Sequence, residues 1–211
     1  GLRDLYSGKN QWDSKANLDS YGKYAALKSK GCTNTDVLTK TNNVEDFIGG
    51  KAAMIIDGTW DTQKFTDAMK TNVAAFVPPF SDKPIKGVVE FAGQGLAMTN
   101  YSKNQAAASK FLEFMTTDAA AKILDSVGLI PNIIGSKTTN PVNQQMLDFA
   151  AKKSFVRYPM LDNVLQGDVV DAGNKIIPAI LGGKTKAADG LKQMAQVWKA
   201  LPAAKRGASY N

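Results

Sequence analysis

The stretch FIGGKAAMIIDGTW, residues 47–60, constrains the fold of this chain more than any other part of the sequence. Its apolar run AAMII, residues 52–56, stands between glycine turns. A short continuous apolar run of this kind is typical of a strand covered on both faces, as in a parallel sheet. Helical apolar spacing precedes it at residues 44–48, and Thr59 after it is placed to cap a further helix. The stretch therefore predicts a helix–strand–helix unit of an α/β protein.

Two more segments are predicted as strands. Residues 73–77 (VAAFV) form a buried apolar run that ends at a proline pair, and residues 88–99 (VVEFAGQGLAMT) read as two strands around a glycine interruption. Helices are predicted at residues 14–30, 102–115, 117–127, 140–153, parts of 161–180, and 185–198. Strands alternate with helices early and helices dominate late, which predicts an α/β fold with a helical C-terminal half.

Local signals predict the ends and the buried faces of these helices. Ser102 and Gln105 have capping-box spacing, and Pro178 is expected to interrupt its segment. Further expected caps and stops are Asp13 or Ser14, Gly31, Thr117, Gly128, Asn140 before Pro141, Gly167 and Thr185. The inward-facing residues are expected to be Ile123, Leu124 and Val127 in one helix, and Leu191, Met194, Ala195 and Trp198 in the last.

Composition excludes several classes of function. The chain has 211 residues and a net charge of +7, but its lysines are scattered, so a solvated surface is favoured over a nucleic-acid site. It contains no histidine, which excludes histidine-dependent triads and removes the commonest zinc ligand. The single cysteine, Cys32, allows no internal disulfide. Metal-ligand spacing and a phosphate-binding loop are absent, so no metal and no cofactor are expected.

The opening stretch resembles the extracellular solute-binding proteins of ABC importers, the maltose-binding-like family. The family pattern is a short helix ending in phenylalanine and glycine, then lysine, two alanines, methionine, a strand and glycine-x-tryptophan. The matching residues are Phe47, Gly50, Lys51, Ala52, Ala53, Met54, Gly58 and Trp60. Further matches follow in order at AGQGLAMT (residues 92–99), residues 102–124, Gly128 with Pro131, and residues 183–198. The resemblance therefore covers most of the chain.

This resemblance implies the C-terminal lobe of a periplasmic-binding-protein type II fold, with helices that return to the other lobe. Residues 1–100 would be the α/β part of the C-terminal, ligand-binding lobe, and residues 101–135 would be helices that pack on the N-terminal lobe. Residues 136–211 would be a helical segment that returns to the C-terminal lobe. Family members are roughly twice as long, and Gly1 is not a natural start, so we expect a processed or partial chain. The missing N-terminal lobe would have been cut away, would lie on another chain, or would be replaced by a swapped partner. Residues 102–127 should then expose an apolar face.

The resemblance also implies a function. The chain would be the non-catalytic substrate-binding component of an ABC transporter, which binds a carbohydrate between two lobes and delivers it to a membrane permease. It would work outside the cell or in the periplasm, anchored through an upstream lipoprotein signal. Three alternatives stay open: the same fold binding a polyamine or an anion, a secreted carbohydrate-active enzyme, and an interaction module without a ligand.

Trp60 and Asp57 lead the candidate ligand-binding residues. Both lie at the C-terminal end of the predicted strand, where open α/β sheets place ligands. An indole face there would stack on a sugar ring, although an aromatic packed under the loop is the alternative. The Asp57 carboxylate would accept sugar hydroxyls, or would act as a helix cap or a surface charge.

Four further residues are weaker candidates. Gly93 would let the backbone approach a ligand and Gln94 would donate and accept hydrogen bonds, unless the pair marks only a bend or hinge. Arg157 and Tyr158 lie in a predicted non-helical link where the family often places ligand contacts, and their local sequence favours a surface loop. Asp57 with Glu90 is the conceivable carboxylate pair of a glycosidase, but no other catalytic signature accompanies it, so no catalytic residues are expected.

Overall fold

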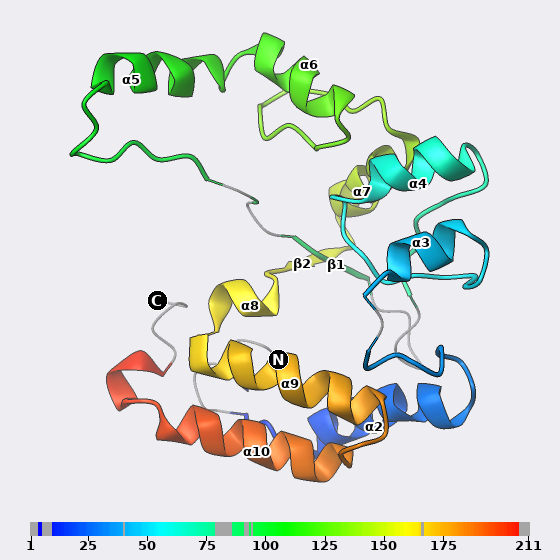
Figure 1. Cartoon of the computed structure of the whole chain (residues 1–211). Helices are drawn as coiled ribbons and strands as arrows, with labels where there is room; N and C mark the ends of the chain where they lie inside the picture. Colours follow the sequence, from blue (N-terminus) through cyan, green and yellow to red (C-terminus); the bar gives the residue numbers. More distant parts are fainter. Residues whose placement is uncertain are drawn as a thin grey trace. The chain divides into compact units, whose positions relative to one another are not determined.

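The computed structural model describes residues 4–5, 10–39, 41–78, 86–90, 93, 95–165 and 167–206. The chain forms two compact units (Figure 1). Unit 1 contains Gly1–Asn42 and Pro159–Asn211, and unit 2 contains Asn43–Tyr158. Unit 1 is therefore built from both ends of the chain, and unit 2 from its middle.

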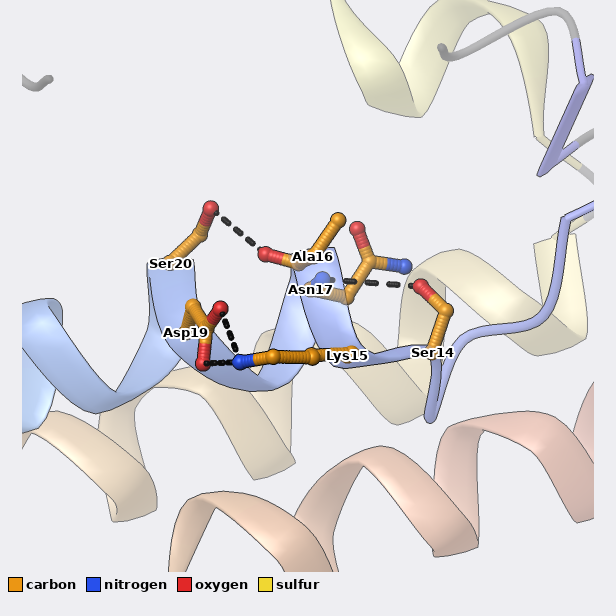
Figure 2. Close-up of polar contacts among 6 residues, drawn as sticks. All are labelled: Ser14, Lys15, Ala16, Asn17, Asp19 and Ser20. Carbon is orange, nitrogen blue, oxygen red and sulfur yellow. Dashed lines mark hydrogen bonds and ion pairs between the residues drawn. The ribbon is translucent and has the colours of Figure 1, made fainter.

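Helices make up the described part of unit 1. They are α2 (Lys15–Ser29), α8 (Leu161–Val164), α9 (Gly167–Leu181), α10 (Ala187–Ala200) and the 3-10 helix η1 (Ala203–Lys205). Ser14 caps α2 as predicted, because its Oγ accepts from the Asn17 backbone N–H at 3.5 Å. Figure 2 shows this cap beside the exposed Lys15–Asp19 ion pair of 2.8 Å. Gly31, at φ +70°, ends the helix as expected.

The core of unit 1 lies where α2, α9 and α10 meet. Leu191, Met194 and Ala195 are buried there and Trp198 packs against them, which confirms the predicted stripe of the last helix. Trp12, from the segment before α2, is part of the same cluster. Burial of such side chains supplies the main favourable free energy of folding.

Unit 2 combines five helices and two strands among its described residues. They are α3 (Asn43–Ile48), α4 (Thr62–Met69), β1 (Gly87–Val89), α5 (Gln105–Phe114), α6 (Asp118–Ser126), α7 (Pro141–Ala151) and β2 (Val156–Tyr158). The strands are parallel and pair Val88 with Arg157. The predicted short helix before the glycine pair is confirmed as α3, and its Phe47 ring meets Phe65 of α4 edge to face at 5.3 Å.

Three of the four predicted strands do not form, and the fourth corresponds to the short strand β1. Residues 52–56 form no regular secondary structure and pair with no strand among the described residues, and Met54 and Ile56 are 68% and 76% exposed. Residues 73–77 and 95–99 are likewise outside any strand, and β1 is the one predicted piece that forms. Extended backbone becomes a strand only when a neighbour takes up its N–H and C=O groups. The described residues supply one such pairing, between β1 and β2.

Four helix boundaries differ from the predictions. α10 begins at Ala187 after Lys186, so Thr185 is not its cap. α4 begins at Thr62 after Asp61, so Thr59 is not its cap. The capping box before α5 does not form, because Ser102 Oγ accepts from the Asn104 N–H and the Gln105 amide donates to the Asn100 carbonyl. α9 continues through Pro178 to Leu181: the proline lies in the last turn, which the Gly182 N–H closes onto the Pro178 carbonyl at 2.8 Å.

The helices α5 and α6 carry an exposed apolar face, as predicted. No residue of α5 is buried, and Phe111 of α5 and Ile123 of α6 are 54% and 57% exposed. Figure 1 shows α5 at one end of unit 2, away from α4 and α7. The expectation that Ile123 and Val127 face a core is therefore wrong. The buried positions of α6 are Ala120, Ala121 and Asp125.

Candidate ligand-binding site

Trp60 lies in the turn between the irregular segment 52–57 and α4. Its indole ring rests on the backbone of Gly58, because a Cβ added to Gly58 would overlap the ring atoms Cζ3 and Cη2. Glycine is thus the residue that allows this ring position. Trp60 is 50% exposed. An aromatic ring supported by the backbone and half open to solvent has the geometry of a stacking platform.

Asp57 lies next to this platform and is half-buried. Its Oδ1 accepts from the Gly58 backbone N–H at 2.7 Å, and its Oδ2 makes no hydrogen bond to a described residue. The carboxylate therefore holds the Gly58 turn with one oxygen. It does not cap α4, whose N-terminal flanking residue is Asp61.

A buried polar pair lies directly behind the Trp60 turn. The Thr62 hydroxyl lies 2.8 Å from the Thr59 carbonyl oxygen and 2.7 Å from Asn143 Oδ1. The Asn143 side chain is fully buried, and its Nδ2 donates to the Gly128 carbonyl at 2.8 Å. These contacts join the start of α4 to α7 and to the end of α6. These contacts were not predictable, because no local sequence pattern signals a pair 81 residues apart.

A second polar group fixes the start of α7. Asn140 caps this helix, as predicted, and its Nδ2 donates to Thr66 Oγ1 at 3.1 Å.

Asp125, buried in α6, accepts from the hydroxyls of Thr138 and Thr139 at 2.7 Å each and from the Thr139 N–H at 3.0 Å. Burial by itself would raise the Asp125 pKa, but the bonds from Thr139 and Thr138 outweigh it and hold the pKa below its ordinary value.

Arg157 and Tyr158 lie in β2, so the favoured surface loop is wrong in its backbone, although both side chains are exposed. The Arg157 guanidinium pairs with Glu90 at 3.2 Å and donates to the Ala150 carbonyl. The Tyr158 ring lies over Gly87 of β1, where an added Cβ would meet Cε2 at 2.5 Å. Both members of the exposed ion pair are open to solvent, so it contributes little to stability.

The remaining candidates stay apart from these groups. Gly93 has φ +73°, is exposed, and has space for a Cβ without contact. Gln94 lies outside the described residues. The structure thus joins Trp60 with Asp57 in one turn and Arg157 with Tyr158 in one strand. Helix α7 contacts both α4 and β1, the elements next to these two groups.

Two general features of the site bear on its chemistry. Within the described residues, no His, Cys, Asp and Glu side chains gather in a group that would hold a metal ion. The polar groups next to Trp60 in the chain are the Asp57 carboxylate and backbone groups, which are able to form hydrogen bonds with a solute. In the described part of the chain no helix is both long and apolar enough to cross a membrane.

Comparison with known proteins places the chain in a family. Residues 3–122, more than half of the chain, match the bacterial extracellular solute-binding proteins. The chain belongs to this family. The resemblance inferred from residues 47–60 is thereby confirmed.

This solute-binding protein is similar to a curated relative in sequence and to a solved structure in fold. The maltooligosaccharide ABC transporter solute-binding lipoprotein of Streptococcus pneumoniae, in strains TIGR4 and R6, is 30% identical over 142 residues, which are 65% of this chain and 33% of the relative. A solved chitin oligosaccharide binding protein superposes with a TM-score of 0.81 at 20% identity, over 98% of this chain and 53% of that one. The predicted α/β fold class is confirmed.

Each match covers only part of the relative's length. This solute-binding protein spans about a third of the length of the curated relatives it matches, and about half of the solved structure. The relatives are named as binding proteins rather than enzymes.

Proposed function

We propose that this solute-binding protein is the carbohydrate-binding component of an ABC importer. The observation that carries the proposal is Trp60, whose ring rests on Gly58 and is half exposed beside the Asp57 carboxylate. Sugar rings have apolar C–H faces and peripheral hydroxyls, so an aromatic platform beside an acceptor suits them. The names of the relatives, which refer to maltooligosaccharides and chitin oligosaccharides, support the same class of ligand.

Binding would use noncovalent contacts only. Trp60 would stack on a sugar ring and Asp57 Oδ2 would accept a hydroxyl. Gly93 and Gln94, together with Arg157 and Tyr158, are further candidates for contacts. Closure of two lobes around the sugar would then present a surface to a membrane permease, and no covalent step is required of this protein. As the name of the relative suggests, a lipoprotein anchor would hold the protein outside the membrane.

Replacing Trp60 by alanine should weaken oligosaccharide binding about tenfold or more, which equals a loss of at least ~1.4 kcal/mol. The reason is that the variant lacks the ring that stacks on the sugar. Calorimetric titration with maltooligosaccharides and with chitin oligosaccharides measures the effect. Chromatography of the titrated sugars tests at the same time for hydrolysis, which would support an enzyme instead.

Tyr101→Ala is the matched control, because Tyr101 is a highly exposed aromatic of unit 2 away from the Trp60 turn in sequence. Its removal should leave the affinity unchanged. If Trp60→Ala binds sugars as tightly as the parent does, the stacking role is wrong.

We also propose a partner for the apolar face of α5 and α6. Residues 101–135 would pack on a second lobe, while residues 1–100 and 136–211 would belong to the ligand-binding lobe. The exposure of Phe111 and Ile123 supports this arrangement, because apolar faces of this kind mark interaction surfaces. That lobe would form the opposite wall of the sugar site.

Without such a partner, the chain should self-associate through this face. The double variant Phe111→Gln with Ile123→Gln should weaken the association tenfold or more, because a fully buried large apolar side chain contributes roughly 1.5–3 kcal/mol. Sedimentation velocity at several concentrations measures the shift towards monomer. The control, Glu113→Gln with Lys122→Gln, alters exposed polar positions of the same helices and should change little. A parent chain that stays monomeric at all concentrations would count against the proposal.

A further inference from the structure

We infer that Thr62 and Asn143 are positioning residues for Trp60. The inference rests on the proposed function, since it concerns how the same sugar-binding ring is held. Neither residue is accessible: Thr62 is 4% and Asn143 0% exposed, so neither would touch a ligand. Both are polar, and buried polar groups persist in folded proteins when their hydrogen bonds are made.

Polar contacts lead stepwise from the core to the Trp60 turn. Gly128 O accepts from Asn143 Nδ2 at 2.8 Å, and Asn143 Oδ1 lies 2.7 Å from the Thr62 hydroxyl. That hydroxyl lies 2.8 Å from the carbonyl oxygen of Thr59, the residue directly before Trp60. Thr62 has one hydroxyl proton to donate, so Thr59 and Asn143 compete for it.

The Thr62 hydroxyl contacts the Trp60 turn where a side-chain cap of α4 is missing. Asp61, at the N-terminus of α4, makes no side-chain capping bond, so the backbone there lacks the usual support. Thr62 ties the turn to α4 itself, and Asn143 ties Thr62 to α7. On the other side of the tryptophan, Asp57 holds the Gly58 N–H under the ring. Polar contacts to the backbone thus lie on both sides of Trp60, at Gly58 and at Thr59.

The decisive substitution is Thr62→Val, which keeps the branched shape and removes the hydroxyl. Fluorine NMR of protein labelled with 5-fluorotryptophan reads the three indoles separately, and Trp60→Phe assigns the Trp60 signal. Thr62→Val should shift or broaden that signal and leave those of Trp12 and Trp198, which lie in unit 1, unchanged. Thr62→Ser restores the hydroxyl and should restore the parent signal. This readout needs no ligand, so it stands even if no sugar binds.

Thr66→Val is the matched control, because it removes a bonded hydroxyl one turn later in α4, where Thr66 bonds to Thr62, Gln63 and Asn140. It should lower stability but leave the Trp60 signal in place. Should Thr62→Val fail to fold, Thr62→Ala takes its place, since it adds no bulk. An unchanged Trp60 signal in a folded variant without the hydroxyl would overturn the inference.

Binding provides the second readout. Thr62→Val should weaken oligosaccharide binding severalfold in the parent and cause no further loss in Trp60→Ala, because a residue that acts through Trp60 has nothing left to position. Equal losses in both backgrounds would show an independent effect and contradict the inference. If the parent binds no sugar, the proposed function fails, while the fluorine signals still decide the positioning role.

Discussion

Replacing Gly128 by alanine is expected to destabilise unit 2 by about 2–5 kcal/mol. Gly128 has φ +81°, a left-handed conformation that costs other residues roughly 1–2 kcal/mol. An added Cβ would also overlap Cβ of Gln63, which is fixed to the backbone of α4, so the helix itself would have to move. Forcing extra volume into packed structure typically costs about 1–3 kcal/mol. Urea unfolding followed by circular dichroism measures the loss.

Gly135→Ala separates the two causes. Gly135 has almost the same conformation, at φ +82°, but an added Cβ there would meet no atom within 4 Å. We therefore expect it to cost only the conformational part, roughly 1–2 kcal/mol. If the two variants lose equal stability, the close approach of α6 to α4 contributes nothing and the packing argument is wrong.

Gly128 also shows which features of this fold can be read from sequence. Its role as a helix stop was predictable, as were the caps Ser14, Thr117 and Asn140, because each depends on a few neighbouring residues. The apolar stripe of α10 was predictable for the same reason. Its period places Leu191 and Met194 on one face, and that face is the core of unit 1.

The predicted strands failed for a different reason. The run AAMII is apolar, but a strand also needs a partner that accepts and donates its backbone hydrogen bonds. An apolar run predicts that a segment is buried, but it does not identify the element that buries it. The same limit applies to Ile123, whose helical spacing was correct while the expected burial was not.

Of the candidate site, only the residues of the Trp60 turn were predictable from the sequence, and the buried residues behind them were not. The order of Asp57, Gly58 and Trp60 placed a carboxylate and an indole in one turn, and the structure has them there. The buried Thr62–Asn143 pair behind them depends on a contact between α4 and α7, which no local pattern encodes. Whether these residues bind a sugar stays a prediction for the experiments on Trp60.

Asp125→Asn is expected to lower the free energy of unfolding by about 1–3 kcal/mol near neutral pH. The carboxylate accepts three hydrogen bonds from Thr138 and Thr139, and an amide would present its own N–H groups to some of these donors. Because the loss falls on the buried Asp125 side chain, it should exceed that of an exposed change such as Asp118→Asn in the same helix. Urea unfolding of the three proteins at neutral pH tests the difference.

The effect of this substitution should depend on pH in one direction. The Asp125 pKa is lower in the folded protein than its ordinary value of 3.8, so folding releases a proton from this group in acid. Its stabilisation is fully present above that ordinary value and is lost as the pH falls through the lower, folded pKa. The stability gap between the parent and Asp125→Asn should therefore be constant near neutrality and shrink in acid. A gap that stays constant in acid would show that shape, rather than the charge of Asp125, holds residues 138–139 against α6.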